Sequence, residues 1–311
     1  MTEQYSCKLC ASTVGNILLS NIKDWEYGTS GEYAYYQCVS CEQIQLHPFP
    51  DLHQLKEAYP ETYPAYISDI KHNRGKFYDL LLRIHTRLRL HTVLRYLKPE
   101  MKILDVGSGN GDFLCCFKRY GITELYGIDF NQQAIRIMQE KGIHSFHGLY
   151  MDYSAPYESF DVISMNHYIE HVLSPMAELK KSYDLLKPGG ILFGILPNFN
   201  GLDRMLFKTF WGGNHVPRHT FQYTDKQFEK LLKNAGFNKI RVTHDMNPSH
   251  IAISIQNWLQ RNVKDLKNNP NIIHGRMKYF NFLLMLCLPL NIIFSLLKRS
   301  GTMAFYAVKC R

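Results

Sequence analysis

The sequence predicts a doubly wound α/β domain, with a cysteine-rich module before it and a helical insertion near its C-terminal end. Three observations support this fold class. A glycine-rich turn joins an apolar strand to a helical pattern over 102–117, two close cysteine pairs precede it, and an uncharged apolar stretch, 280–297, lies between two strand-like segments. The 311 residues correspond to roughly two average domains of about 100 to 200 residues each.

The composition is that of a folded, basic protein. Hydrophobic residues make up 45% of the chain and charged residues 20%, which excludes an intrinsically disordered chain. The 36 Lys and Arg outnumber the 27 Asp and Glu, and the net charge of +9 favours an anionic partner. Charge alone leaves a phosphorylated substrate, a nucleic acid and an acidic membrane surface open. Residues 1–6 lack the pattern of a secretory signal, so we expect a cytoplasmic protein.

Two cysteine pairs near the N-terminus predict a metal site. Two residues separate the members of each pair, which lets two thiolates point from one turn toward the same ion; the four residues are Cys7, Cys10, Cys38 and Cys41. Reduced thiols with this spacing favour a structural zinc over disulfides, and four protein ligands leave no position for a catalytic water. The alternative is four unrelated buried thiols. Tyrosines and glycines between the pairs predict a hairpin, and hence a zinc-ribbon-like module over residues 1–60.

A connector and a basic helix follow the module. Prolines and tyrosines alternate over 48–66, which predicts an ordered connector. Apolar residues then recur every three or four positions and predict a helix over about 74–97; they include Phe77, Leu81, Ile84 and Leu88. Nine Lys or Arg but only two acidic residues lie over 71–102, so the helix presents either an ordinary solvated face or a surface for an anion.

The glycine-rich turn predicts a nucleotide site. An apolar strand, 102–106, leads into Gly107, Gly109 and Gly111, and a helical pattern follows. Glycines let the backbone turn sharply and approach a ligand, and the helix N-terminus offers free N–H groups. The next strand ends at Asp129, 18 residues beyond Gly111, where a carboxylate accepts hydrogen bonds from both hydroxyls of a ribose.

The spacing of these residues separates two kinds of cofactor. Dinucleotide sites have the pattern G-x-G-x-x-G, whereas here an acid and three glycines alternate with other residues over 105–111. This pattern resembles motif I of the class I S-adenosylmethionine-dependent methyltransferases. Further matches follow in order along most of the chain: the adenine region at 148–152, the fourth strand at 159–163, the turn after it at 166–171 and the Leu-Lys-Pro-Gly-Gly turn at 186–190.

The resemblance implies a Rossmann-like sheet of seven strands that binds S-adenosyl-L-methionine. The residues that it implies for the cofactor site are Asp105, Gly107, Ser108, Gly109, Gly111, Asp129, Phe130, Leu149, Tyr150 and Asn166. One position departs from the family, because Leu149 follows Gly148 where many relatives have an acid. We therefore expect backbone groups of Leu149 and Tyr150, with an apolar sandwich, to bind the adenine.

Histidines are the candidate general bases. Methyl transfer from a sulfonium is an in-line displacement that requires alignment and exclusion of water, and no metal is obligatory. An alcohol acceptor must also lose its proton, usually to a histidine. The candidates are His167 and His171 after the fourth strand and His219 in the segment 211–219, which we expect to form a substrate lid. Ordering of the loop by His171 and packing of His219 are the alternatives. Arg218 is a candidate contact for a substrate phosphate or carboxylate.

The uncharged stretch 280–297 is long enough for a membrane span, but the order of the strands argues against one. Segments 240–244 and 303–308 are expected to be the sixth and seventh strands of one sheet, and a segment that joins them cannot end across a bilayer. Pro289 further weakens a single helix. Two short helices packed on the domain and a monotopic patch at a membrane surface remain alternatives.

Together these features predict five regions. They are a zinc-binding module (1–60), a connector with the basic helix (61–100), the methyltransferase domain (101–248), a helical insertion (249–301) and a last strand (302–311). The combination looks like bacterial methyltransferases of glycan and sugar pathways. The leading prediction is O-methylation of a sugar, glycan or lipid- or nucleotide-linked small acceptor. The alternatives are an RNA methyltransferase, in which the module and the basic helix bind phosphates, and a non-catalytic cofactor-binding scaffold.

Overall fold

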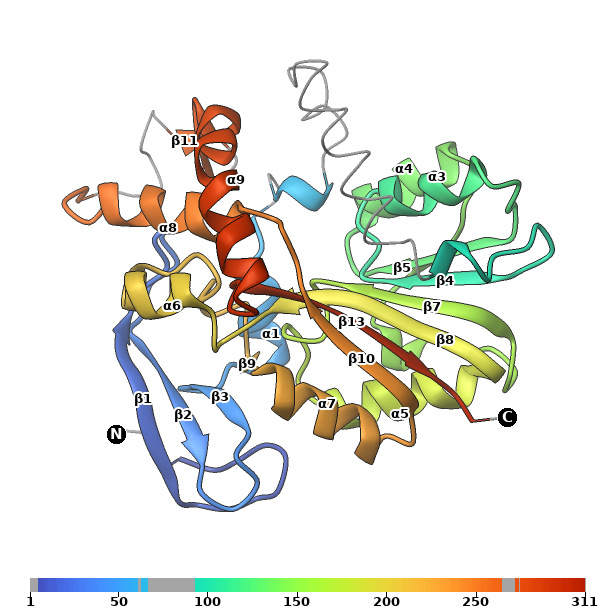
Figure 1. Ribbon diagram of the computed structural model, residues 1–311, viewed down its shortest axis with the longest axis horizontal. Coiled ribbons are helices and arrows are strands. Elements are labelled where there is room, and N and C mark those ends of the chain that lie inside the picture. The colour runs from blue at the N-terminus through green and yellow to red at the C-terminus, as the bar shows by residue number, and fades with distance from the viewer. Residues whose placement is uncertain (1–4, 61–62, 67–92, 265–271, 274, 311) are drawn as a thin grey trace.

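The computed structural model describes residues 5–60, 63–66, 93–264, 272–273 and 275–310 (Figure 1). The basic helix predicted over 74–97 falls almost entirely outside these residues.

A seven-stranded sheet forms the centre of the larger domain. Its strands are β4 (Ile103–Val106), β5 (Leu125–Asp129), β6 (His144–His147), β7 (Phe160–Asn166), β8 (Leu186–Pro197), β10 (Asn238–His244) and β13 (Thr302–Val308). Their order is β10-β13-β8-β7-β4-β5-β6. The neighbouring strands β6, β5, β4, β7 and β8 pair in parallel. The strand β13 is antiparallel to both of its neighbours, β8 and β10. This arrangement confirms the predicted class I sheet with its last two strands antiparallel.

Helices cover both faces of this sheet (Figure 1). Apolar residues of α3 (Asp112–Lys118) and α4 (Gln132–Glu140) pack in one core cluster with β4 and β5. Those of α5 (Pro175–Leu185) and α7 (Asp225–Asn234) pack in a second cluster with β7, β8 and β13. Residues of the inner parallel strands β4, β5 and β7 are mostly buried, which explains their nearly continuous apolar sequences, whereas the edge strand β6 is exposed at both ends and more polar.

Local sequence fixes the loops at the carboxyl ends of these strands. Gly107, Gly109 and Gly111 have φ values of 68°, 51° and 76°, a region that favours glycine. The Asn131 side chain accepts a hydrogen bond from Ala134 N and caps α4, as the sequence predicts. The turn from β4 into α3 therefore follows directly from the glycine pattern.

The N-terminal module is a small antiparallel sheet that is completed by the larger domain. It contains β1 (Gly15–Ile22), β2 (Tyr33–Cys38) and β3 (Ile44–His47), which confirms a hairpin between the cysteine pairs. A short fourth strand, β9 (Phe221–Gln222), pairs with β3. The connector contains α1 (Leu52–Glu57) and the 3-10 turn η1 (Pro64–Tyr66). Local sequence patterns do not indicate that β9, so far along the chain from β3, completes this sheet.

The insertion before β13 consists of helices and a two-stranded hairpin. After β8 come α6 (Leu202–Phe207) and the 3-10 turn η4 (Lys208–Phe210), and the insertion itself contains α8 (Ser249–Leu259), β11 (Ile272–Ile273), β12 (Arg276–Met277) and α9 (Phe280–Leu296). Of the alternatives for 280–297, the pair of short helices is wrong, because α9 continues through Pro289. Its inner residues Leu284 and Cys287 pack on α8, and this packing offsets the cost of a proline inside a helix.

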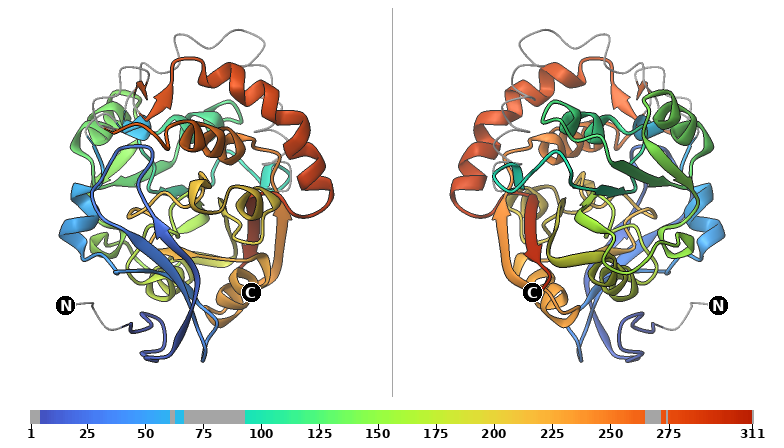
Figure 2. Two further views of the ribbon diagram at one scale, coloured as in Figure 1. Left: turned by 90° about the vertical axis from the view of Figure 1, so that its left-hand side faces the viewer. Right: turned by 90° about the vertical axis from the view of Figure 1, so that its right-hand side faces the viewer.

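Figure 2 shows α9 along the outside of the molecule. Its outer face exposes large apolar side chains, among them Phe282, Leu286, Ile293 and Leu296. Within the described part of the chain, helices are too short or too polar to cross a membrane.

Candidate functional site

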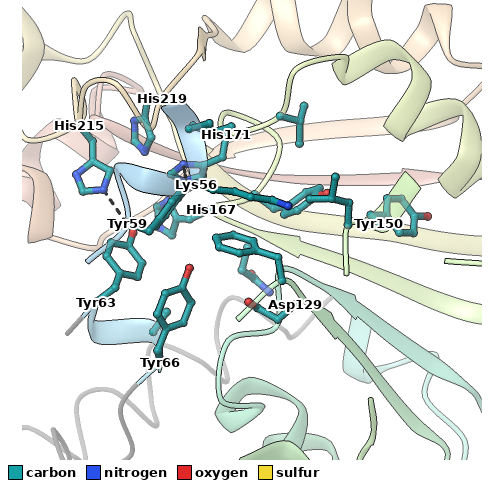
Figure 3. Close-up of a pocket in the computed structure, with 18 of the residues that line it drawn as sticks. Lys56, Tyr59, Tyr63, Tyr66, Asp129, Tyr150, His167, His171, His215 and His219 are labelled. Carbon is teal, nitrogen blue, oxygen red and sulfur yellow. Dashed lines mark hydrogen bonds between the residues drawn. The ribbon is translucent and has the colours of Figure 1, made fainter. Parts of the chain in front are cut away.

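A cavity of about 600 Å³ opens at the carboxyl ends of the parallel strands. The loops after β4, β5, β6 and β7 line one part of it. The connector, α8 and residues 212–219 line the other part. Figure 3 shows His171, His215 and His219 on one side of the view with Tyr59, Tyr63 and Tyr66 below them, and Asp129 and Tyr150 apart from both. One continuous cavity therefore joins the predicted cofactor residues to the predicted bases.

Asp129 stands at the centre of the cofactor part. Its Oδ2 accepts a hydrogen bond from Gly109 N at 2.9 Å, and its Oδ1 accepts one from Asn131 N at 2.9 Å. Burial raises the pKa of Asp129, and these backbone donors oppose the rise. Both oxygens keep lone pairs that suit ribose hydroxyls. The carboxylate thus holds the glycine loop in place and lines the cavity where a nucleoside would lie.

The predicted cofactor residues divide into two groups. Six line the cavity: Gly107, Asp129, Phe130, Leu149, Tyr150 and Asn166. Four lie behind it and shape the loop: Asp105, Ser108, Gly109 and Gly111. Ser108 Oγ donates to Ile128 O, and the Asp105 carboxylate accepts a 2.5 Å hydrogen bond from Ser164 Oγ. A Cβ on Gly111 would lie 2.7 Å from Met138 and Ile143, so only glycine fits there.

Leu149, Tyr150 and Asn166, the predicted contacts for the rest of the donor, also line the cavity. The Tyr150 hydroxyl bonds to Ser182 Oγ at 3.1 Å in the core, and its carbonyl accepts a hydrogen bond of 2.6 Å from Lys181 Nζ. Of its polar groups, the backbone N–H therefore remains for a ligand. Leu149 precedes the 3-10 turn η3 (Tyr150–Asp152). Asn166 Oδ1 is buried and lacks a hydrogen-bond partner among the residues described. Such an orphaned acceptor suits a donor group of a bound ligand.

Connector tyrosines close the cavity from the side of the module. Tyr59 packs against Phe130 with ring centroids 5.3 Å apart, and Tyr66 packs on the same ring at 6.1 Å. Ala65 O accepts a hydrogen bond from Asn110 N at 3.0 Å, which fastens the connector to the glycine loop. The sequence analysis described these tyrosines only as an ordered connector. The alternation of these tyrosines with prolines indicated order in the connector. The position of the connector over the glycine loop depends on tertiary packing, which local sequence does not indicate.

The three predicted histidines line this one cavity. His167 Nδ1 lies 3.2 Å from Glu170 Oε1, so the carboxylate orients this ring. His171 Nδ1 lies 3.0 Å from Arg218 O, and His219 Nδ1 lies 2.8 Å from Gly213 O. The rings of His171 and His219 are in edge contact, with centroids 4.5 Å apart.

Burial makes the deeper histidines weak bases. It lowers the pKa of His171 to about 4 and that of His219 well below the usual value. At neutral pH both imidazoles are therefore uncharged.

Two residues that sequence reasoning missed, His215 and Glu26, form a bridge from the module to the cavity. Glu26 Oε1 lies 2.8 Å from His215 Nδ1, and its Oε2 accepts a hydrogen bond of 2.6 Å from Arg276 Nη1. All three side chains line the cavity. The N-terminal module thus contributes directly to the wall of the candidate active site.

Two expectations about residues 211–219 are wrong. Arg218 is fully buried and pairs with Asp24 at 2.9 Å, so it does not face a substrate. It also donates to Ala58 O at 2.7 Å, and it therefore fastens the module and connector to the larger domain. The segment is a packed wall instead of an exposed lid, since Trp211 and Val216 are both buried. The sequence around Arg218 contains histidines but no acid, so it did not indicate that Asp24 of the distant module is its partner.

The four cysteines of the module meet at its tip. Cys7 Sγ lies 3.6 Å from Cys41 Sγ, and Cys10 Sγ lies 3.5 Å from Cys38 Sγ. All four sulfurs are within 4.8 Å of one another. Sulfurs at about 2.3 Å from a tetrahedral zinc are separated by about 3.8 Å, close to these distances. Both turns have the same shape: the residue after each pair has a positive φ and donates its N–H to the carbonyl of the first cysteine.

Comparisons with known proteins agree with this geometry. A family model described as a methyltransferase domain matches residues 72–242, more than half of the chain. A demethylmenaquinone methyltransferase of Staphylococcus haemolyticus is 27% identical over 47% of this chain and 72% of its own length. A ubiquinone biosynthesis O-methyltransferase of Dinoroseobacter shibae is 30% identical over 45% of this chain and 61% of its own length.

A solved structure agrees in fold. Its description names a sarcosine dimethylglycine methyltransferase of Galdieria sulphuraria, and it is 14% identical, with a TM-score of 0.51, over 79% of this chain and 91% of that chain. The glycine loop, the strand order and the family match lead to the same conclusion: the chain belongs to the methyltransferase-domain family and is a class I S-adenosylmethionine-dependent methyltransferase.

Proposed function

We propose that the protein transfers the methyl group of S-adenosyl-L-methionine to a hydroxyl of a small acceptor, a sugar, a glycan end or a lipid- or nucleotide-linked group. The observation that carries this proposal is the single cavity with cofactor residues in one part and histidines and tyrosines in the other. Its volume of about 600 Å³ is in the range of small-molecule sites. The tyrosine faces suit the apolar face of a sugar ring, and the imidazoles suit its hydroxyls.

His167 is the proposed general base. A carboxylate that holds one imidazole nitrogen leaves the other nitrogen to accept a proton, as in other carboxylate–histidine pairs. Here Glu170 Oε1 holds His167 Nδ1, and the side chain of His167 is 35% exposed toward the cavity. His171 and His219 are less suited to this role, because burial lowers their pKa.

An aromatic hydroxyl is a second candidate acceptor. The two curated relatives are named for demethylmenaquinone and for ubiquinone biosynthesis. The same tyrosines that suit a sugar face would stack on an aromatic ring, as Tyr59 and Tyr66 already do with Phe130.

The four cysteines are proposed to hold a structural zinc. The near-tetrahedral spacing of the sulfurs and the matching pair of turns support this assignment. Metal analysis of the purified protein should find zinc, and Cys38→Ser should lose it and unfold at a lower temperature. Ser40→Ala, in the same turn, is the control. A Cys38→Ser protein with the full zinc content would contradict the assignment.

The exposed apolar face of α9 is proposed to touch a membrane surface peripherally. Phe282, Leu286 and Ile293 are each more than half exposed on this face. Lys298 and Arg299 follow the helix and suit anionic headgroups. Such contact would bring the cavity close to a lipid-linked acceptor.

The acceptor class is tested by transfer of a labelled methyl group. Purified protein and labelled donor are incubated with fractionated glycan, lipid and RNA, and label is expected in glycan or lipid. Label only in RNA would support the alternative function, and label in none, with intact donor binding, would support a non-catalytic scaffold.

Donor binding is tested separately at Asp129. Asp129→Ala should weaken binding of S-adenosylhomocysteine by about 100-fold or more, since two charge-assisted hydrogen bonds of about 1.5 to 3 kcal/mol each are lost. Glu140→Ala removes an exposed acid of α4 that is not part of the cavity lining, and it should bind normally. Calorimetry measures both, and equal affinities would remove Asp129 from the ribose site.

A further inference from the structure

Glu170, His171 and His219 bring three metal-ligating atoms together beside the cavity. His171 Nε2 and His219 Nε2 each lie 4.0 Å from Glu170 Oε1. All three atoms lie within 4.8 Å of one another. Figure 3 shows His171 and His219 next to each other at the end of the cavity away from Asp129. The cluster is separate from the four cysteines of the module.

Both imidazoles present the correct nitrogen. His171 Nδ1 lies 3.0 Å from Arg218 O and 2.8 Å from the Tyr59 hydroxyl. A backbone carbonyl can only accept a hydrogen bond, so a proton on Nδ1 satisfies both contacts, with the tyrosine oxygen as a second acceptor. His219 Nδ1 carries a proton for the same reason, because it lies 2.8 Å from Gly213 O. The Nε2 lone pairs are then free to coordinate an ion. Metal-bound histidines commonly donate their other N–H to a carbonyl in this way.

Among the described residues, the ion-pair contacts of the Glu170 carboxylate are with histidines and with neither Lys nor Arg. The Glu170 side chain is 1% exposed, and its Oε2 has no hydrogen-bond partner among the described residues. Oε1 accepts a hydrogen bond from His167 Nδ1. A buried carboxylate with an unpartnered oxygen is costly unless a cation sits beside it.

We propose that Glu170, His171 and His219 bind a divalent transition-metal ion whose open positions face the acceptor part of the cavity. Two imidazole nitrogens and one carboxylate form a donor set typical of catalytic zinc and other open metal sites. Ligands at about 2.1 Å from a tetrahedral ion lie about 3.4 Å apart. Each 4.0 Å separation from Glu170 therefore has to shorten by less than 1 Å, which a small side-chain rotation provides.

The metal site extends the proposed function, and the reaction step described below rests on that function. With an ion held by Glu170, His171 and His219, the metal would act as a Lewis acid and lower the pKa of the acceptor hydroxyl, whose proton His167 Nε2 would accept. The oxygen lone pair then forms the new O–C bond. The C–S bond of the sulfonium breaks, its electron pair stays on sulfur, and a neutral thioether leaves. The ion keeps its oxidation state, and the proton later passes from His167 to solvent.

The test is a titration of the full-length, zinc-containing protein with Co²⁺, followed by calorimetry and visible absorption. The wild type should bind one equivalent of Co²⁺ saturably. The H171A/H219A double variant should bind none. Glu170→Gln keeps the shape of the side chain but removes a ligand. Loss of a partner outside the ligand set weakens metal binding by about 10- to 100-fold, and Glu170→Gln should weaken Co²⁺ binding by more than this. His53→Ala, at an exposed histidine of α1, should behave as the wild type.

Binding of S-adenosylhomocysteine to each variant separates this proposal from the function itself. Unchanged affinity shows that the variants are folded and that the cofactor part is intact. Absence of saturable Co²⁺ binding to wild type, or equal binding to H171A/H219A, overturns the metal site while the methyltransferase function stands. If S-adenosylhomocysteine fails to bind wild type although Co²⁺ binds, the proposed function fails and the metal site stands.

Discussion

Replacement of Arg218 by methionine tests whether the buried ion pair holds the module against the larger domain. Arg218 Nη2 lies 2.9 Å from Asp24 Oδ1, and the two side chains are 0% and 1% exposed. The guanidinium also donates to Ala58 O at 2.7 Å and to His215 Nε2 at 2.9 Å. Arg218→Met keeps much of the apolar volume but leaves the Asp24 carboxylate buried without its cation.

The expected loss is large for a single substitution. Removal of one partner of a buried pair costs about 3 to 5 kcal/mol, because the remaining charge is uncompensated. The unfolding entropy of a chain of 311 residues is about 0.65 kcal/mol per kelvin, at about 2.1 cal/mol/K per residue. The midpoint temperature should therefore fall by about 5 to 8 °C.

Differential scanning calorimetry of the wild type and Arg218→Met measures this shift. The control is Glu32→Gln, which breaks the exposed Lys23–Glu32 pair of the same module, where the atoms are 2.9 Å apart. Exposed pairs contribute less than about 1 kcal/mol, so the control should shift by less than about 2 °C. Equal shifts in the two variants would refute the argument that the pair is uncompensated when Arg218 is lost.

Two further predictions concern pH and the membrane. Burial raises the pKa of Asp203 to about 6, although Trp211 Nε1 donates to it at 2.8 Å. Relative to Asp203→Asn, the wild type should lose unfolding free energy as pH rises from about 4 to 6, because the unfolded chain releases this proton near its ordinary pKa while the folded protein still holds it. Urea denaturation of both proteins across this range checks the sign, and parallel curves would contradict it. Leu286→Asp or Ile293→Asp should weaken cosedimentation with anionic phospholipid vesicles by about 10- to 100-fold, since each removes an apolar side chain worth about 1.5 to 3 kcal/mol. Tyr157→Asp, at an exposed aromatic residue outside α9, is the control, and an equal loss there would exclude α9 as the contact.

Much of the fold was predictable because local patterns determine it. The glycines at 107, 109 and 111 require positive φ, and their spacing after an apolar strand defines the turn into α3. The Asn131 cap and the apolar runs of the buried strands are likewise local signals. The sheet order followed from the family resemblance. These features explain why the sequence predicted the cofactor part of the cavity and the helical insertion.

The acceptor part was less predictable because its contacts join distant residues. Glu26 reaches His215 across the boundary between the module and the domain, and Arg218 is buried by Asp24. Residue type suggested a substrate contact for Arg218, but burial reversed that assignment. The Glu170 carboxylate was not singled out at all, since an acid in a loop is unremarkable until its environment is known. Pro289 favoured a break in the helix, but α9 continues through it, because packing of α9 on α8 outweighs the tendency of proline to interrupt helices.

The pairing of β9 with β3 has a consequence for how the protein is made. The ribosome releases the first three strands of the small sheet long before it synthesises Phe221 and Gln222, which complete that sheet. During this interval the open edge of β3 has unpaired backbone groups, and such an edge is a template for other chains. A fragment that stops before β9 should therefore aggregate, whereas the whole polypeptide protects this edge with its own residues.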